Sequence, residues 1–359
     1  MISDTAATQD LPLQSPSISD TTMVLSVIVP ARNEADCLGD CLRSLVAQSD
    51  VGFVLGQDWE LVVVDDHSAD ATCRIATSFA GVSVLNAPDL TDGWTGKANA
   101  VWAGAKQAHG EWLLFTDADT VHEPGNLRRA LHEAQRAKVS LLSYSPKQIV
   151  QGFWQRVLMP LIYAELAVKY PPQMVNNPAS PIAAANGQFL LIERQAYSRI
   201  GGHEAIKSAV LEDVELARRA KRAKIGLRFR YAPDAVSARM YRSFGAMYEG
   251  WTKNLALLFP NAPLLAFWKL LEFTLLVALP FLASWLIIPV QRIAVMLWWF
   301  WRLGVHYTRA SRAHFSVLDT LLSPLGLPLF AWLLVRSWLH RNLRKQVSWK
   351  GRIYATPVK

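Results

Sequence analysis

The fold is decided by the stretch VLSVIVPARNE at residues 24–34. Residues 24–30 form a continuous apolar run of strand length, which is typical of a parallel strand buried on both faces. A polar loop follows, and a helical pattern of apolar residues begins at Leu38. A buried strand, a polar loop and a helix in this order predict the first unit of an α/β sheet.

The same alternation continues along the following hundred residues. Further strands are predicted at 60–65, 82–86, 112–116 and 139–144, and a helix is predicted at 97–108. We therefore expect an α/β fold with a Rossmann-like, mostly parallel sheet. Ligands bind such sheets beyond the carboxyl ends of the strands, so the residues that follow each strand are the first candidates for a site.

Acidic residues gather at that predicted edge. Asp65 and Asp66 end the second strand, and Asp117 and Asp119 follow the fourth. Paired carboxylates suit Mg²⁺ or Mn²⁺ held together with substrate phosphates, although an isolated D-x-D also fits an exposed turn. No G-x-G-x-x-G follows the first strand and no P-loop pattern occurs, so the usual dinucleotide and P-loop signals are absent.

Charge is distributed unevenly along the 359 residues. Residues 264–359 hold 12 Lys and Arg against 2 Asp and Glu, whereas the preceding 263 residues hold 25 against 27. A nucleic-acid binder would carry its basic residues on the globular part, so we expect no nucleic-acid partner. A near-neutral domain joined to a basic, apolar tail is the better description.

The tail contains three apolar runs, at 273–291, 293–301 and 320–335. The first is free of charge over nineteen residues, close to the length that spans hydrocarbon. Eight of the 14 Trp residues lie beyond residue 264, and Trp favours the membrane interface. We expect membrane helices here. A buried soluble subdomain is the alternative, and the number of crossings stays open because the shorter runs also fit interfacial helices.

The side of the membrane follows from basic residues and from the amino-terminal segment. Residues 1–22 contain no Lys or Arg and lack the pattern of an export signal. Arg302, Arg309 and Arg312 between the later apolar runs, and the basic residues after 336, are expected on the cytosolic side. An even number of crossings and a cytosolic catalytic domain are therefore expected.

Six motifs, in chain order, carry a resemblance to a known family. VIVPARNE, VVVDDHSADAT, GWTGKANA, FTDADT, ANGQFLLI and LEDVELARR are similar to the motifs of family 2 glycosyltransferases of the GT-A fold. GWTGK and RMYRSFGAMYEGWTKN resemble the membrane-bound bacterial members associated with hopanoid and carotenoid pathways. The resemblance covers about residues 24–260, and the terminal WKGRIY at 349–354 also resembles these relatives.

The resemblance implies both a domain organisation and a function. We expect a disordered leader at 1–22, a GT-A domain at 23–262, transmembrane or interfacial helices at 263–340 and a basic cytosolic tail at 341–359. The implied enzyme is a multi-pass inner-membrane glycosyltransferase that moves a sugar from a UDP- or GDP-sugar to a membrane lipid with inversion. A processive polysaccharide synthase and an inactive GT-A membrane scaffold are the alternatives.

The resemblance also assigns roles to residues. Asp119 is expected to bind Mg²⁺ or Mn²⁺, Asp117 to face the ribose or the metal, and Lys97 to supply positive charge, unless it is a solvated lysine at a helix start. The remaining residues expected to bind the nucleotide sugar are Pro30, Ala31, Arg32, Glu34, Asp66, Asn186, Gly187, Arg239 and Arg242.

Asp213 matches the aspartate that the family uses as general base. It lies with Glu212, expected as a supporting residue, at the start of a helical run, where acidic residues also serve simply to cap helices. One departure from the family concerns Arg239 to Ser243, where many relatives carry Gln-x-x-Arg-Trp. Since Ser243 replaces the Trp that stacks on a growing chain, the sequence disfavours a processive polymer synthase.

Overall fold

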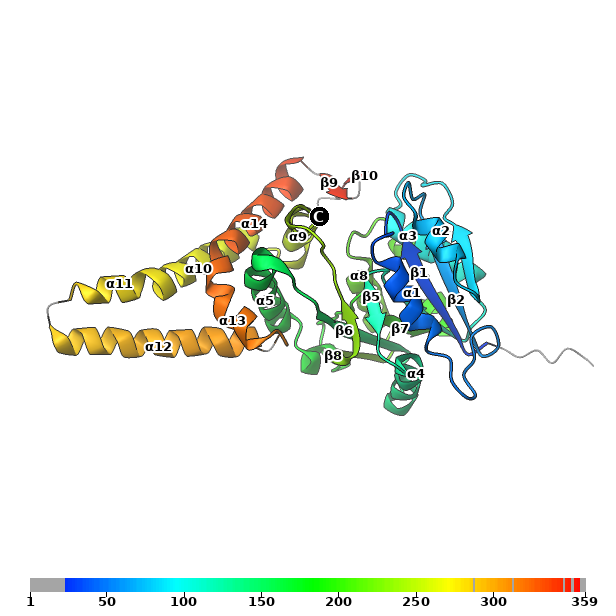
Figure 1. Ribbon diagram of the computed structural model, residues 1–359, viewed down its shortest axis with the longest axis horizontal. Helices are drawn as coiled ribbons and strands as arrows, with labels where there is room; N and C mark the ends of the chain where they lie inside the picture. Colours follow the sequence, from blue (N-terminus) through cyan, green and yellow to red (C-terminus); the bar gives the residue numbers. More distant parts are fainter. Residues whose placement is uncertain (1–22, 287, 312, 345, 350–351, 356–359) are drawn as a thin grey trace, which may run out of the picture.

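The computed structural model describes residues 23–286, 288–311, 313–344, 346–349 and 352–355. The leader predicted at 1–22 lies outside the described residues, as do parts of the predicted tail at 341–359. A single mixed sheet of eight strands forms the first part of the chain, and a group of helices follows it (Figure 1).

The sheet has the strand order β3-β2-β1-β4-β7-β6-β8-β5. Strands β3, β2, β1 and β4 run parallel, β7 runs antiparallel to both of its neighbours, β6 and β8 run parallel to each other, and β5 closes the edge antiparallel to β8. The strands span Leu25–Ala31 (β1), Trp59–Asp65 (β2), Val82–Asn86 (β3), Trp112–Phe115 (β4), Thr120–His122 (β5), Leu141–Gln148 (β6), Leu190–Glu193 (β7) and Leu227–Ala238 (β8).

The first four predicted strands are confirmed to within one residue at each end. The predicted fifth strand at 139–144 begins two residues later, as β6, and extends to Gln148. No strand is predicted at β5 or β8, because β5 has only three residues and Arg228, Arg230 and Asp234 interrupt any apolar run in β8. Most strands nevertheless run parallel, as predicted.

Helices cover both faces of the sheet. One core packs α1, α2 and α4 against one face, and a second packs α3, α7 and α8 against the other. These helices span Leu38–Val46 (α1), Thr72–Thr77 (α2), Gly96–Gln107 (α3), Asn126–Ala137 (α4), Arg194–Arg199 (α7) and Glu212–Arg222 (α8). The predicted helix at 97–108 is α3, whose start is fixed by the Thr95 hydroxyl accepting a hydrogen bond from the Ala98 amide.

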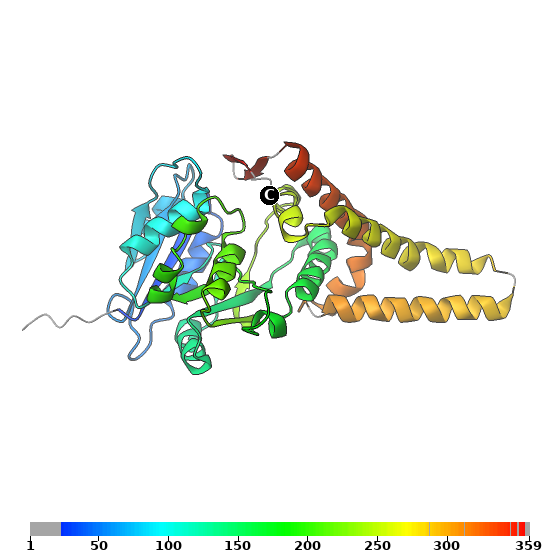
Figure 2. The ribbon, with the colours of Figure 1, turned by 180° about the vertical axis from the view of Figure 1, so that it is seen from behind.

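The remaining helices lie to one side of the sheet (Figure 2). They span Gly152–Lys169 (α5), Pro172–Val175 (α6), Phe244–Leu258 (α9), Ala262–Phe273 (α10), Leu279–Ser284 (α11), Pro289–Ser311 (α12), Val317–Leu322 (α13) and Leu327–Leu339 (α14). A short antiparallel pair, Gln346–Trp349 (β9) and Arg352–Ala355 (β10), follows them. Helices α10 and α11 form one limb of a long hairpin and α12 forms the other, and the hairpin projects away from the sheet.

The apolar runs of the tail fold differently from the prediction. The nineteen-residue run at 273–291 is not one helix, because α11 ends at Ser284 and α12 begins at Pro289, which places the turn of the hairpin inside the run. Proline is favoured at the first turn of a helix, where its missing N–H costs nothing. Arg302 and Arg309, which lie between the later apolar runs of the sequence, belong to the last turns of α12.

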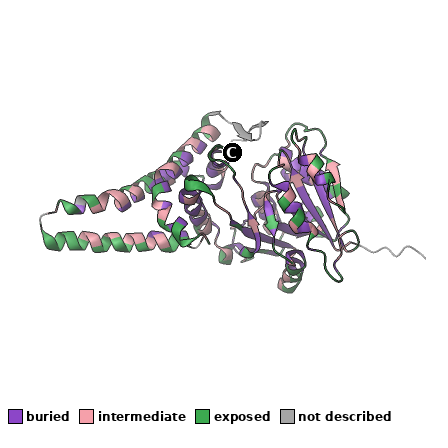
Figure 3. Cartoon of the chain, in the orientation of Figure 1, coloured by how far each residue is buried: buried purple, intermediate pink, exposed green. Residues whose placement is uncertain are grey.

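The helical part is packed directly onto the sheet. One continuous core joins the sheet face under α3 to α5, α9, α10 and α14. The outer length of α12 is different, since among its described side chains only His306 and Ala310 are buried, and Figure 3 shows the exposed surface along the hairpin. Ala262–Phe281 and Val317–Leu343 are long and apolar enough to cross a membrane by length and composition.

Candidate active site

A cleft of about 380 Å³ opens at the carboxyl ends of β1, β2 and β4. The parallel register places Ala31 of β1 beside Asp65 of β2, so the loops that follow these strands emerge together. All fourteen residues with a predicted role line this cleft: Pro30, Ala31, Arg32, Glu34, Asp66, Lys97, Asp117, Asp119, Asn186, Gly187, Glu212, Asp213, Arg239 and Arg242. The first and last of these residues, Pro30 and Arg242, are more than two hundred positions apart in the sequence.

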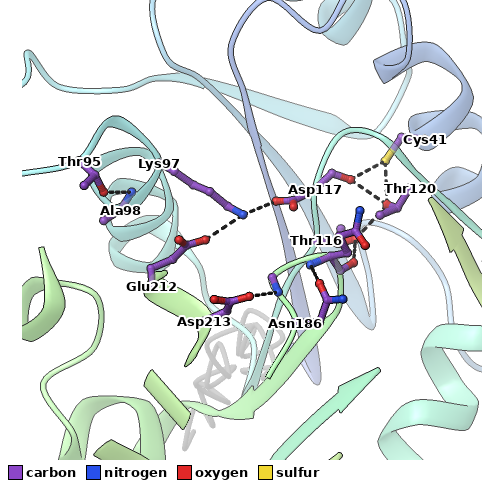
Figure 4. A network of polar contacts seen from close by, with 12 residues as sticks. Cys41, Thr95, Lys97, Ala98, Thr116, Asp117, Thr120, Asn186, Glu212 and Asp213 are labelled. Carbon is purple, nitrogen blue, oxygen red and sulfur yellow. Dashed lines mark hydrogen bonds and ion pairs between the residues drawn. The ribbon is translucent and has the colours of Figure 1, made fainter. Parts of the chain in front are cut away.

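Lys97 is the electrostatic centre of the cleft (Figure 4). Its Nζ lies 2.7 Å from Asp117 Oδ1 and 2.8 Å from Glu212 Oε1. Burial works against the charged amine, yet these two carboxylates hold the pKa of Lys97 well above its usual range. Lys97 is therefore not the solvated lysine of the alternative interpretation, since it joins the end of β4 to the start of α8.

Asp213 is held by backbone donors. The Gly187 amide donates to Asp213 Oδ2 at 2.9 Å, and the Val214 amide donates to Oδ1 at 2.7 Å. Burial, followed by the charge of Glu212, raises the pKa of Asp213 to about 6. A carboxylate with a raised pKa in a cleft is better suited to accept a proton near neutral pH than an ordinary aspartate.

Glu212 differs from its neighbour although the two are adjacent in sequence. Burial acts to raise its pKa, but the charge and hydrogen bond of Lys97 prevail and lower the pKa of Glu212. Glu212 is thus kept ionised by its ion pair, whereas Asp213 has a pKa close to neutral pH. Opposite shifts on neighbouring acids are typical of a site in which the two have different tasks.

Gly187 lets the backbone approach this charged group closely. A Cβ atom at this position would lie 2.9 Å from Lys97 Nζ and 3.4 Å from Glu212 Oε1. The residue stands in a loop before β7, and its neighbour Asn186 is anchored by the Ser143 hydroxyl, which accepts from the Asn186 amide at 2.8 Å. A side chain here would push against the ion pair, so glycine keeps the floor of the cleft open.

The wall formed by the loops after β1 and β2 is tied together by Arg32 and Asn33. Arg32 Nη1 donates to the Asp66 carbonyl at 2.6 Å, and the Ala69 amide donates to Asn33 Oδ1 at 2.8 Å. Asn33 has φ 51°, a left-handed conformation that asparagine tolerates better than most residues. These contacts give the wall a fixed shape around the polar groups of Asp66.

The end of β4 supplies Asp117 and Asp119 to the cleft. The Arg239 amide donates to the Asp119 carbonyl at 3.1 Å, which brings the segment around Arg239 and Arg242 against the acidic pair. Among the described residues, no group of three or more His, Cys, Asp or Glu side chains surrounds a common point. Asp117 and Asp119 offer carboxylate oxygens, the donor type that Mg²⁺ or Mn²⁺ takes together with phosphate oxygens and water.

Several residues that line the cleft escaped the sequence analysis. Gln188, Tyr241, Lys253 and Asn254 all contribute to its surface. Burial lowers the pKa of Lys253 to about 8, even though the surrounding carboxylates act to raise it. A lysine inside the apolar helical run of α9 was the available signal for this position.

Comparisons with known proteins agree with this geometry. The model of the family described as Glycosyl transferase family 2 matches residues 26–201, a span that contains β1 to β4 and the acidic pair at the end of β4. Residues 26–201 therefore form a glycosyl transferase family 2 domain. The resemblance that its motifs indicated is thereby confirmed, and the protein is a glycosyltransferase.

Two relatives of this family 2 enzyme align over nearly its whole length. It is 24% identical over 357 residues to the 4,4'-diaponeurosporenoate glycosyltransferase of Staphylococcus aureus strain USA300, with 96% of this chain and 91% of that protein covered. It is 27% identical to the enzyme of the same name from Staphylococcus haemolyticus, with 94% and 90% covered. Both alignments extend beyond the family domain into the carboxyl-terminal helices.

The fold is that of a solved glycosyltransferase. A mannosyltransferase from Pyrobaculum calidifontis, determined in complex with GDP-Man and Mn²⁺, superposes with a TM-score of 0.52 at 19% identity, covering 89% of this chain and 87% of that one. The catalytic part of this family 2 enzyme accordingly has the GT-A fold, as the motifs predicted.

Proposed function

We propose that this family 2 enzyme transfers a sugar from a UDP- or GDP-sugar to a membrane lipid, with inversion at the anomeric carbon and Asp213 as general base. The observation that carries the proposal is the fixed carboxylate of Asp213, which lies in one cleft with the acidic pair of β4. The acceptor oxygen attacks the anomeric carbon, its proton passes to Asp213, and the bond to the diphosphate oxygen breaks.

The donor is proposed to occupy the part of the cleft between the first loops and the end of β4. Pro30, Ala31, Arg32, Glu34 and Asp66 would contact the nucleoside, and Asn186 and Gly187 would face the donor sugar. Arg239 and Arg242 line the same cleft and suit the negative charge that develops on the leaving diphosphate, since a guanidinium binds phosphate oxygens in a forked geometry.

A divalent cation fits beside the diphosphate. Asp119 would hold Mg²⁺ or Mn²⁺, with Asp117 contributing only in exchange for part of its contact with Lys97. Such an ion, when bound, acts as a Lewis acid that stabilises the departing diphosphate. Lys97 keeps Glu212 ionised and holds both Asp117 and Glu212 in position before the donor arrives.

The lipid acceptor and the inner-membrane location are supported by the helical part and by the relatives. Both relatives are 4,4'-diaponeurosporenoate glycosyltransferases, and we extend the class of lipid acceptor, not that compound, to this enzyme. The limb Ala262–Ser284 and the limb Pro289–Ser311 would enter and leave the bilayer on the same side. Each has 23 residues, about 34 Å of helix, against roughly 30 Å of hydrocarbon.

The proposal is tested by product analysis with the full-length protein in bacterial membranes. A panel of radiolabelled UDP- and GDP-sugars is supplied with Mg²⁺, with Mn²⁺ or with a chelator, and the lipid extract is separated and its labelled product weighed by mass spectrometry. We expect one donor to label a lipid with a single sugar in a metal-dependent reaction. Asp213→Asn should abolish labelling while donor binding, measured by calorimetry, stays near normal.

Other outcomes separate the alternatives. A ladder of products of increasing length would identify a processive polysaccharide synthase. Label found only in a water-soluble product would show that the acceptor is not a lipid. Donor binding lost together with activity in Asp213→Asn would remove Asp213 from the role of base and assign it to the donor site instead.

A further inference from the structure

Exposed aromatic side chains form a continuous patch at the rim of the cleft. The rim patch consists of Phe153 and Trp154 of α5, Phe244 and Tyr248 of α9, and Trp332 of α14. Ring centroids lie 5.2 Å apart for Phe153 and Trp154, 5.6 Å for Trp154 and Phe244, and 5.7 Å for Phe244 and Tyr248. Trp332 continues the patch by donating its Nε1 hydrogen to the Tyr248 hydroxyl at 2.9 Å.

Four of the five rings of the patch face solvent, and the fifth, Tyr248, is partly buried against the core. Phe153, Trp154 and Phe244 are 49%, 46% and 44% exposed, and Trp332 is 53% exposed. Leaving large rings in water forgoes the burial that normally stabilises a fold, and clustered exposed rings mark surfaces that bind something apolar. We therefore expect the patch to bind an apolar partner.

The patch begins at the edge of the catalytic cleft. Arg242 and Ala246 line the cleft, and Phe244 lies between them in sequence at the start of α9. Gln155, one residue after Trp154, donates its Nε2 hydrogen to the Tyr241 carbonyl at 3.2 Å, and Tyr241 also lines the cleft. The segment that leads into α9 thus lines the cleft and carries Phe244 of the patch, and α5 is hydrogen-bonded to that segment.

The other end of the patch reaches a candidate membrane segment. Trp332 belongs to α14, within the apolar stretch Val317–Leu343. The guanidinium of Arg336, one turn further along α14, lies 4.8 Å from the centre of the Tyr248 ring. Trp and Tyr rings with a wet polar edge, accompanied by Arg, have the composition of the layer where lipid headgroups meet hydrocarbon.

We propose that the rim patch rests in the headgroup layer of the bilayer and is the port through which the lipid acceptor enters the cleft. This inference rests on the proposed transfer of sugar to a lipid. The patch gives the lipid acceptor a route into the cleft, because an amphiphile whose tail stays in the bilayer can move its polar end past Phe244 to the acceptor side. Arg336 and the basic tail favour a bilayer that contains anionic lipid.

The experiment places a reporter at the patch. In a Cys73→Ser background, which leaves the two buried native cysteines in place, Phe153→Cys and Phe244→Cys are labelled with an environment-sensitive fluorophore. The full-length protein is reconstituted in phosphatidylcholine and phosphatidylglycerol vesicles that carry a spin label either on the headgroup or deep in the acyl chain. We expect strong quenching at both positions by the headgroup label and weaker quenching by the deep label.

Two control positions make the result decisive. Val51→Cys lies 94% exposed in the loop before β2, at the amino ends of the strands, and should not be quenched. Leu297→Cys lies 65% exposed on α12 and should be quenched by the deep label. Quenching at Leu297→Cys without quenching at the patch would overturn the port while leaving membrane insertion intact. No quenching at any position would overturn both the port and the membrane location.

Kinetics supply the functional readout. Phe153→Ser combined with Phe244→Ser should raise the KM for a lipid acceptor in vesicles by about tenfold or more, because exposed rings lose their contact with lipid. The KM for the nucleotide sugar should not change, and Val51→Ser should behave like the unmodified protein. Protection of the fluorophore that depends on protein concentration without vesicles would instead identify a second copy of the chain as the occupant and refute the proposal.

Discussion

The protonation of Asp213 should cause the transfer rate to fall at low pH, a fall that we call the acid limb of the pH–rate profile. Burial and the charge of Glu212 raise the pKa of Asp213 to about 6, whereas a general base acts only in its charged form. About nine-tenths of the molecules carry the charged form at pH 7 and about one-tenth at pH 5. Transfer measured as kcat/KM should therefore fall about tenfold when the pH is lowered from 7 to 5.

Glu212→Gln tests the physical cause of this limb. The substitution removes the neighbouring negative charge, so the pKa of Asp213 should fall and the acid limb should move to lower pH. Glu215→Gln is the matched control, because Glu215 lies on the same helix but its carboxylate contacts Arg218 at 3.2 Å. It should leave the limb where it is.

The assay is the initial rate of sugar transfer to lipid between about pH 4.5 and 8, with donor binding followed in parallel. Asp213→Asn should lose about 10²- to 10⁴-fold in rate and should show no acid limb. If the limb persists in Asp213→Asn, or if Glu212→Gln leaves its position unchanged, Asp213 is not the titrating base and the reasoning fails.

Three other substitutions address the remaining parts of the cleft. Asp119→Ala should weaken metal-dependent donor binding, and an unchanged Mn²⁺ titration of donor binding would remove Asp119 from the metal site. Lys97→Met should lower the free energy of unfolding by roughly 2 kcal/mol, because it leaves the Glu212 carboxylate without its ion pair. This is less than for a fully buried pair, since the Lys97 side chain is 38% exposed. Arg128→Met, which breaks an exposed pair with Asp50, should change the free energy of unfolding by less than about 0.5 kcal/mol. Denaturant titration measures both changes. Gly187→Ala should slow transfer with little loss of stability, because its Cβ meets the movable end of Lys97; an unchanged rate would show that the close approach is not needed.

The sequence predicted the acidic side of the site because that side depends on local order. Asp66, Asp117 and Asp119 lie within four residues of the end of a strand that is apolar enough to be recognised. Parallel strands bring their carboxyl ends to one edge, so position in the chain was sufficient to place these side chains together. Their placement is confirmed, and their roles stay predictions.

The sequence did not predict what the helices contribute to the site. Lys253 comes from α9, which does not directly follow a predicted strand. The turn of the hairpin falls inside a charge-free apolar run, between Ser284 and Pro289. Hydropathy reports how apolar a segment is, but not whether the chain reverses within it.

By itself, the sequence determined the fold class, the family and the edge of the sheet at which chemistry occurs, because strand periodicity and short motifs act over a few residues. Only the tertiary structure decided that Lys97 pairs with both Asp117 and Glu212, and that α5, α9 and α14 bring their rings together beside the cleft. Those contacts join residues dozens to more than a hundred positions apart. Pairings over such distances are set by how helices pack, and no local pattern encodes that packing.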